Sequence, residues 1–165
     1  MVLYHYSGHE IKKLKKKKEY PQWAITCNNK PCGMWFSVLG EEGWAEWCKR
    51  EGFRLEDLTN IYKAKLKSNA KILKITKESD LIPFYEKYKT AEEILDKVMP
   101  WRKKTIQPFP NGPQFINWVE VAKDYQGIYI ETYSAYYWMP NPWLYGWDCI
   151  SACIWDLSCV ESFTK

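Results

Sequence analysis

The sequence predicts an α+β fold built around a mostly antiparallel β-sheet with flanking helices. Short β-rich segments outnumber helical ones, and the two kinds do not alternate regularly along the chain, as they would in a parallel α/β fold. The 165 residues contain no Ser/Gly linker, internal repeat or change of composition. A chain of this length can bury one substantial core, so we expect a single domain spanning residues 1–165.

Six segments have strand character. Residues 33–38 form an apolar and aromatic run that is too short for a helix, and residues 61–67 alternate between apolar side chains and lysines. The other candidates are short runs rich in apolar residues. The six predicted strands are residues 2–7, 33–38, 61–67, 71–76, 128–132 and 149–155.

Four segments have helical character. The first follows Glu42, carries two tryptophans and a cysteine on one face, and ends before Gly52. Ser79 is expected to cap the second. The other three helices are predicted over residues 79–89, 91–99 and 115–125. Residues 10–19 are expected to form a short helix or a loop, and residues 105–114 and 133–145 to form loops.

Aromatic residues and lysines are the conspicuous features of the composition. Aromatic residues make up 17% of the chain, more than a core of this size needs, so some rings are expected to line a cleft or partner surface while most simply pack. The net charge is +4, and six lysines fall within residues 12–18. Such a run is either solvated surface or a site that attracts nucleic acid or an acidic partner.

The six cysteines form no CxxC pair, and no apolar segment follows the lysine run as it would in a secretory signal. We therefore expect reduced, buried thiols and a cytoplasmic protein that does not contact a membrane. No apolar window is long enough for a membrane span.

Residue types that commonly carry chemistry give little direct guidance. His5 and His9 are the only histidines, a glycine separates them, and no third ligand lies nearby, so a metal site is not expected. The sequence places neither histidine beside a thiol, which leaves cysteine catalysis without a base. The glycines at 33, 40 and 43 fit neither the Rossmann nor the P-loop spacing.

Two motifs resemble the ADP-ribosyltransferase superfamily, in particular its diphtheria-toxin-like and poly(ADP-ribose) polymerase branch. Residues 3–7, LYHYS, are similar to the branch's first strand, with its pattern apolar-aromatic-His-Gly-Ser/Thr. Residues 33–37, GMWFS, and the later AEWC of residues 45–48 are similar to its Gly-Ile-Tyr-Phe strand and following helix. The segments 118–130 and 147–155 also resemble phage and bacterial proteins associated with this superfamily, which suggests such a source.

The resemblance implies split antiparallel sheets and a nicotinamide pocket for NAD as substrate. His5 would bind a ribose hydroxyl, the backbone of Tyr6 would hold the nicotinamide amide, and Ser7 completes the motif. Trp35 and Trp47 would sandwich the nicotinamide ring. Ser37 could offer a hydroxyl at the same wall. The alternative for both tryptophans is ordinary core packing.

The family also uses a late acid that stabilises positive charge on the ribose as nicotinamide leaves. Asp148 is preferred for this role because aromatic residues precede it and it stands just before an apolar strand. Glu131, at the end of an earlier strand, is the second choice. A turn-forming aspartate is the structural alternative for Asp148.

Three functions follow as hypotheses. The first is a mono-ADP-ribosyltransferase that modifies a host protein or nucleic acid, acting in the host cytoplasm if viral. The second is an inactive relative that binds NAD-derived nucleotides as a sponge or acts as an inhibitor. The third is a nucleic-acid-binding module that uses the lysine run and exposed aromatic residues.

Overall fold

The computed structural model describes residues 1–16, 18–26, 29–100, 114–131 and 141–165. These residues form an α+β structure with one mixed sheet of seven strands and four α-helices, which confirms the predicted class. The predicted loops over residues 105–114 and 133–145 lie largely outside the described residues.

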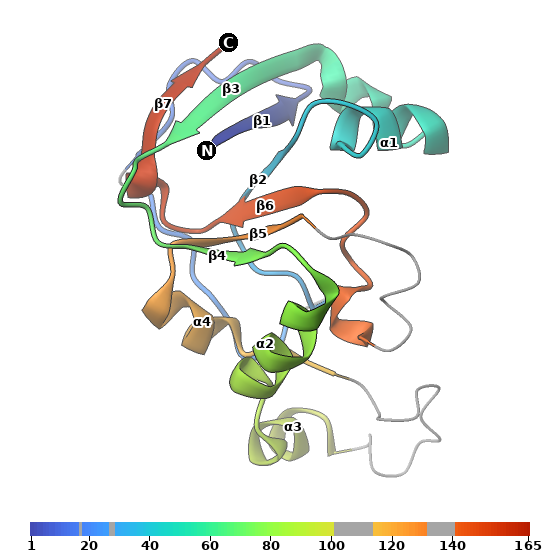
Figure 1. The fold of residues 1–165 in the computed structure, drawn as a ribbon, viewed down its shortest axis with the longest axis vertical. Coiled ribbons are helices and arrows are strands. Elements are labelled where there is room, and N and C mark those ends of the chain that lie inside the picture. Colours follow the sequence, from blue (N-terminus) through green and yellow to red (C-terminus); the bar gives the residue numbers. More distant parts are fainter. Residues whose placement is uncertain (17, 27–28, 101–113, 132–140) are drawn as a thin grey trace.

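The sheet has the strand order β4-β5-β6-β2-β1-β3-β7 (Figure 1). Its β4–β5 pair is parallel, and the other neighbouring strands are antiparallel. The last strand was not predicted, because its sequence VESFT is short and largely polar. The bounds are β1 (Val2–Ser7), β2 (Met34–Ser37), β3 (Asn60–Leu66), β4 (Ile72–Ile75), β5 (Gly127–Ile130), β6 (Ser151–Ile154) and β7 (Val160–Thr164).

The helices are α1 (Trp44–Glu51), α2 (Leu81–Tyr88), α3 (Glu92–Val98) and α4 (Trp118–Asp124). Gly52 ends α1 with a left-handed φ of 63°, and its N–H donates to the carbonyl of Cys48. The predicted cap at Ser79 is wrong. Ser79 lies in a short 3-10 turn, Glu78–Asp80, and the Asp80 carboxylate accepts the N–H groups of Thr76 and Lys77 at 3.1 and 3.2 Å, so α2 begins only at Leu81.

The described part of residues 10–19, which omits residue 17, is irregular rather than helical. Ile11 and Leu14 pack into the core, and the N–H of Ile11 donates to the Tyr62 hydroxyl at 2.6 Å. Backbone hydrogen bonds hold its far end, from the N–H of Tyr20 to the carbonyl of Trp155 at 2.8 Å and from the N–H of Leu157 to the carbonyl of Lys18 at 3.2 Å. We call residues 10–20 the strap. These contacts hold it in place, so its described lysines project from a fixed segment.

Two apolar clusters lie on opposite faces of β5 and β6. One face packs against α2 and α4 through residues such as Ile130, Phe84 and Trp118. The other face, which carries Tyr129, Ala152 and Ile154, packs with Leu3 and Ala64 from β1 and β3. The sheet therefore folds over itself, with β1, β3 and β7 forming a layer above β4 to β6 (Figure 1).

The two halves of the sheet are joined weakly. β1 pairs with β3 along its whole length, but its antiparallel pairing with β2 consists of Tyr4 opposite Ser37. The predicted split sheets are thus one sheet that parts between β1 and β2. Among the described residues, no helix combines the length and the apolar character needed to cross a bilayer.

Candidate functional site

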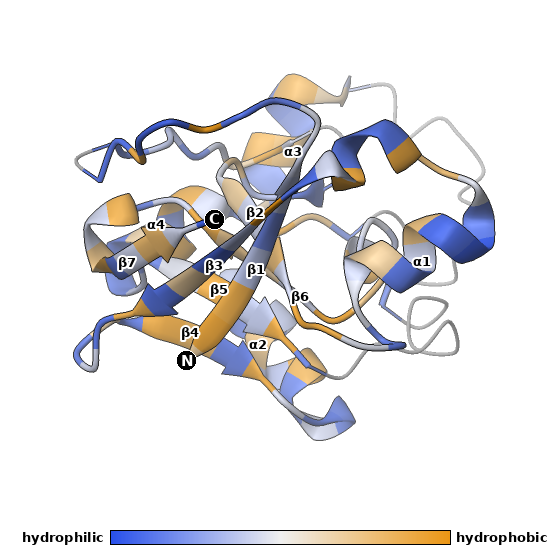
Figure 2. Cartoon of the chain, turned by 90° about the horizontal axis from the view of Figure 1, so that it is seen from above, coloured by the Kyte–Doolittle hydropathy of each residue, from blue (hydrophilic) through white to orange (hydrophobic). Residues whose placement is uncertain are grey.

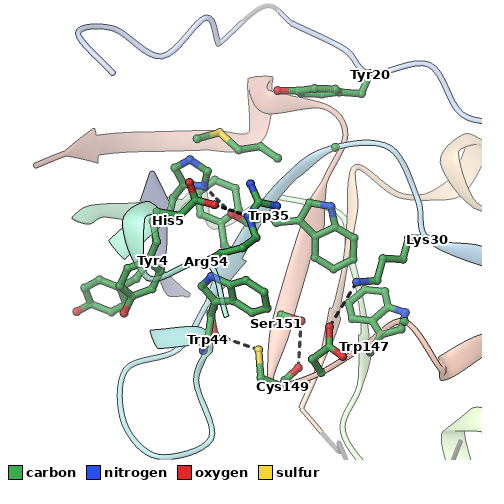
Figure 3. A pocket seen from close by; sticks show the side chains of 18 of the residues that line it. Tyr4, His5, Tyr20, Lys30, Trp35, Trp44, Arg54, Trp147, Cys149 and Ser151 are labelled. Atoms are coloured by element: carbon green, nitrogen blue, oxygen red, sulfur yellow. Dashed lines mark hydrogen bonds and ion pairs between the residues drawn. The ribbon is translucent and has the colours of Figure 1, made fainter. Parts of the chain in front are cut away.

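A pocket of about 520 Å³ opens where β1 and β2 part (Figure 3). Consecutive residues of both strands line it, although their side chains alternate between the two faces of the sheet. Other parts of the wall come from the segment before β2, from α1 and the turn after it, and from the segment before β6. Its lining includes Tyr4, His5, Tyr6, Lys30, Trp35, Ser37, Trp44, Arg54, Asp57, Trp147, Asp148 and Cys149.

His5 bridges the opening between the strands. Its Nδ1 lies 2.7 Å from the carbonyl oxygen of Trp35, and since a carbonyl can only accept, Nδ1 carries the proton. Nε2 is then the acceptor of the neutral ring. Burial lowers the pKa of His5, against the opposing effects of the Trp35 carbonyl and Asp57, so the ring is neutral at pH 7.

Two indole rings, a lysine and an aspartate meet at one wall. The rings of Trp35 and Trp147 have centroids 4.8 Å apart at an angle of 58°. Lys30 Nζ lies 5.2 Å from the centroid of the Trp35 ring and 3.6 Å from Asp148 Oδ2. Burial raises the pKa of Asp148, while Lys30 acts in the opposite direction. The acid therefore sits in a half-desolvated place beside a cation.

The tryptophans of α1 divide between the pocket and its support. Trp44 lines the pocket, whereas Trp47 lies outside the lining and stacks on Trp44 with centroids 5.1 Å apart at 16°. Phe53 packs edge-on against both rings. Of the predicted pair, Trp35 lines the pocket, whereas Trp47 lies behind Trp44.

The remaining predicted residues differ in their surroundings. Tyr6 lines the pocket, and burial raises the pKa of its phenol. The Ser37 hydroxyl also lines it, but it donates to the carbonyl of Ile150 at 2.7 Å and accepts the N–H of Trp44 at 2.8 Å, so it connects β2, α1 and the segment before β6. Ser7 and Glu131 lie outside the lining, and Glu131 is exposed.

Arg54 and Asp57 belong to the pocket and were not predicted from the sequence. Arg54 directly precedes the 3-10 helix η2 (Leu55–Thr59) and Asp57 lies within it, with Arg54 Nε 2.6 Å from Asp57 Oδ2. Arg54 has a left-handed φ of 48°, a conformation that is rare for arginine and that no sequence motif indicated. Trp147, by contrast, could have been found, because it precedes Asp148 directly.

The described groups of this site do not favour cysteine nucleophilic catalysis or metal binding. Cys149 lines the pocket, and burial raises the pKa of its thiol to about 11, so it is a protonated, weak nucleophile at neutral pH. Within the described residues, no group of three or more His, Cys, Asp or Glu side chains is placed to hold a metal ion.

Similarity to known proteins does not identify the function of this pocket. Comparisons with protein-family models, curated proteins and solved structures find no match to this chain. The chemistry of the pocket is therefore the main guide to function.

Proposed function

We propose that the pocket binds NAD and that the protein transfers ADP-ribose to a macromolecular acceptor. The observation that carries this proposal is the convergence of His5, Trp35 and Asp148 from three distant segments on one pocket. Its volume, about 520 Å³, suits an organic ligand of nucleotide size.

The groups around the pocket fit the parts of NAD. The Nε2 atom of His5 is the acceptor that a ribose hydroxyl requires. Trp35 and Trp44 offer flat faces for the nicotinamide ring. Because β1 has no ladder with β2 beyond Tyr4, main-chain groups of Tyr6 on that edge can hydrogen-bond the nicotinamide amide.

Asp148 has the catalytic role in this proposal. The bond between C1′ of the ribose and the nicotinamide nitrogen breaks, its electron pair leaves with nicotinamide, and positive charge develops on the ribose. An ionised carboxylate near C1′ stabilises that charge. A nucleophilic oxygen or nitrogen of the acceptor then bonds to C1′ and loses its proton.

Nicotinamide release from NAD tests this role for Asp148. We expect Asp148→Asn to reduce turnover by roughly 10²- to 10³-fold, as removal of one stabilising group in a transition state typically does. Glu131→Gln is the matched comparison, because it makes the same change at the other acid that the sequence suggested. A larger loss from Glu131→Gln than from Asp148→Asn would contradict the assignment.

His5→Ala tests NAD binding at the same pocket. Quenching of tryptophan fluorescence should report binding, because three tryptophans line the pocket. We expect saturable binding by the parent protein and a clear loss of affinity in the variant. If NAD neither binds nor releases nicotinamide, the proposed function is wrong.

The Lys30–Asp148 contact favours a second candidate, a protein that binds NAD-derived nucleotides without turnover. With Lys30 Nζ 3.6 Å away, Asp148 already has a cationic partner and is less free to stabilise charge on a ribose. Saturable NAD binding without nicotinamide release would support this second function over the first.

A further inference from the structure

The upper layer of the sheet has one face that no helix among the described residues covers. Side chains alternate along β3, so that Tyr62, Ala64 and Leu66 are buried while the residues between them are exposed. Figure 2 looks down on β1 and β3 and shows no helix over them. The register assigns the outward positions, here named the outer strand face, to Val2, Tyr4, Tyr6, Ile61, Lys63, Lys65, Ser162 and Thr164.

Cations and aromatic rings stand side by side on this outer strand face. Lys63 lies opposite Tyr4, and Ile61 lies opposite Tyr6. No member of the face is acidic. The register partners of Lys63, Tyr4 and Thr164, are uncharged, whereas Lys87 on α2 lies 3.2 Å from the carboxylate of Asp124.

The lysine run joins the same surface. Glu161, at the irregular step between β3 and β7, contacts Lys65 Nζ through its carboxylate at 2.9 Å. Its carbonyl accepts Lys16 Nζ at 2.5 Å. Lys16 and Lys65 therefore lie next to each other, and the exposed lysines of the strap extend the positive surface of β3.

The outer strand face also leads into the pocket. Tyr4 and Tyr6 belong to the face, and both line the opening between β1 and β2. A polyanion lying along Lys65 and Lys63 would reach the pocket across these two rings.

We propose that the outer strand face binds single-stranded nucleic acid, which is the acceptor for the proposed ADP-ribose transfer. Lys16, Lys63 and Lys65 contact phosphates, and Tyr4 and Tyr6 stack on unpaired bases. Rings can stack in this way only where the bases are unpaired, so Tyr4 and Tyr6 add affinity for single strands and not for a duplex. The identity of the acceptor rests on the proposed function, whereas binding to the face does not.

Fluorescence anisotropy with labelled 20-nucleotide oligo(dT) and oligo(rU) tests binding without NAD. We expect Lys63→Gln/Lys65→Gln to weaken binding by roughly tenfold at low salt and to reduce the slope of log K against log salt by about 1–2. The control Lys74→Gln/Lys97→Gln removes the same charge from exposed positions on β4 and α3 and should change neither value. Equal weakening by both double variants would overturn the proposal.

Tyr4→Ala separates base stacking from simple charge attraction. We expect roughly 5- to 150-fold weaker binding of single strands, from the loss of one stacked ring, and no change with double-stranded DNA. A thermal melt of the variant shows whether it is folded. If polyglutamate of equal charge displaces the oligonucleotide as well as unlabelled oligonucleotide does, the face binds acidic chains in general and the proposal fails.

Transfer of label from adenine-labelled NAD to the bound oligonucleotide tests the acceptor. Label on the oligonucleotide that is lost in Lys63→Gln/Lys65→Gln, with nicotinamide release unchanged, supports the proposal. Label on protein only, with the oligonucleotide bound, overturns it. If the parent protein releases no nicotinamide from NAD, the proposed function is refuted, but the oligonucleotide-binding result still stands.

Discussion

The two halves of the sheet bury their strands to different extents. Every residue of β5 and β6 is buried, because α2 and α4 cover one face and the upper layer covers the other. β3 buries only alternate residues, and its other face meets solvent. β5 and β6 thus have no free face, and the upper half supplies both the outer strand face and one wall of the pocket.

The contrast is sharpest along the two edges of β1. Its edge toward β3 is paired from Val2 to Ser7, whereas its edge toward β2 is paired only at Tyr4. The open edge leaves room for a ligand, and the His5 side chain bridges it through the Trp35 carbonyl. The pocket therefore forms because β1 and β2 pair only at Tyr4, and not because an extra element is inserted between them.

The largest expected effect is on stability in the lower half. Ile130→Ala empties a fully buried position on β5 and should lower the free energy of unfolding by about 2–5 kcal/mol. Ile61→Ala makes the same change in the upper half, at a side chain that is 46% exposed, and should cost no more than about 0.5 kcal/mol. Urea denaturation measures both, and similar losses would show that the two halves do not differ.

Asn29 tests how the segment before β2 is fixed to the lower half. Its buried side chain donates to the carbonyl of Gln114 at 2.5 Å and accepts the N–H of Ile116 at 3.0 Å, with a left-handed φ of 55°. Asn29→Ala should lower the free energy of unfolding by about 2–4 kcal/mol, from unsatisfied buried groups and backbone strain. Asn29→Gly loses the same hydrogen bonds but tolerates the left-handed backbone, so it should cost less than Asn29→Ala. Equal costs for the two variants in a urea titration would show that backbone strain does not contribute.

His5 should make the upper half sensitive to acid. Burial, the main cause, lowers its pKa below the ordinary 6.5, so the folded state resists protonation more than the unfolded state does. The resulting stability is present above pH 6.5 and is lost as the pH falls through the lowered value. In His5→Gln this part of the acid destabilisation should disappear from the pH dependence of urea unfolding. An unchanged acid limb would show that His5 does not cause it.

Much of the fold could be predicted because its signals are local. The apolar run over residues 33–38 and the alternation over 61–67 gave β2 and β3, and Gly52 gave the end of α1. β7 could not be predicted, because a short polar edge strand is stabilised by its pairing with β3 and not by its own residue types. The start of α2 depended on Asp80 binding two backbone N–H groups, which no spacing rule distinguishes from a cap at Ser79.

The pocket was harder to predict than the fold, because its residues meet only through tertiary structure. Trp44 and Trp47 share one face of α1 and both contact Phe53, so which ring lines the pocket depends on how the whole helix is placed. Asp148 and Glu131 both adjoin apolar strands, and the sequence does not show that Asp148 lies beside Lys30 while Glu131 is exposed.

Lys30→Met should have a small effect on stability and a specific effect on activity. The ion pair with Asp148 is partly exposed, so its loss should cost about 0–1 kcal/mol in urea unfolding. Lys30 opposes the rise that burial causes in the pKa of Asp148, so removing the cation raises that pKa further. A higher pH is then needed to ionise the acid, and the acid limb of the pH profile for nicotinamide release should shift upward. If the limb stays in place, Asp148 is not the group whose ionisation controls turnover.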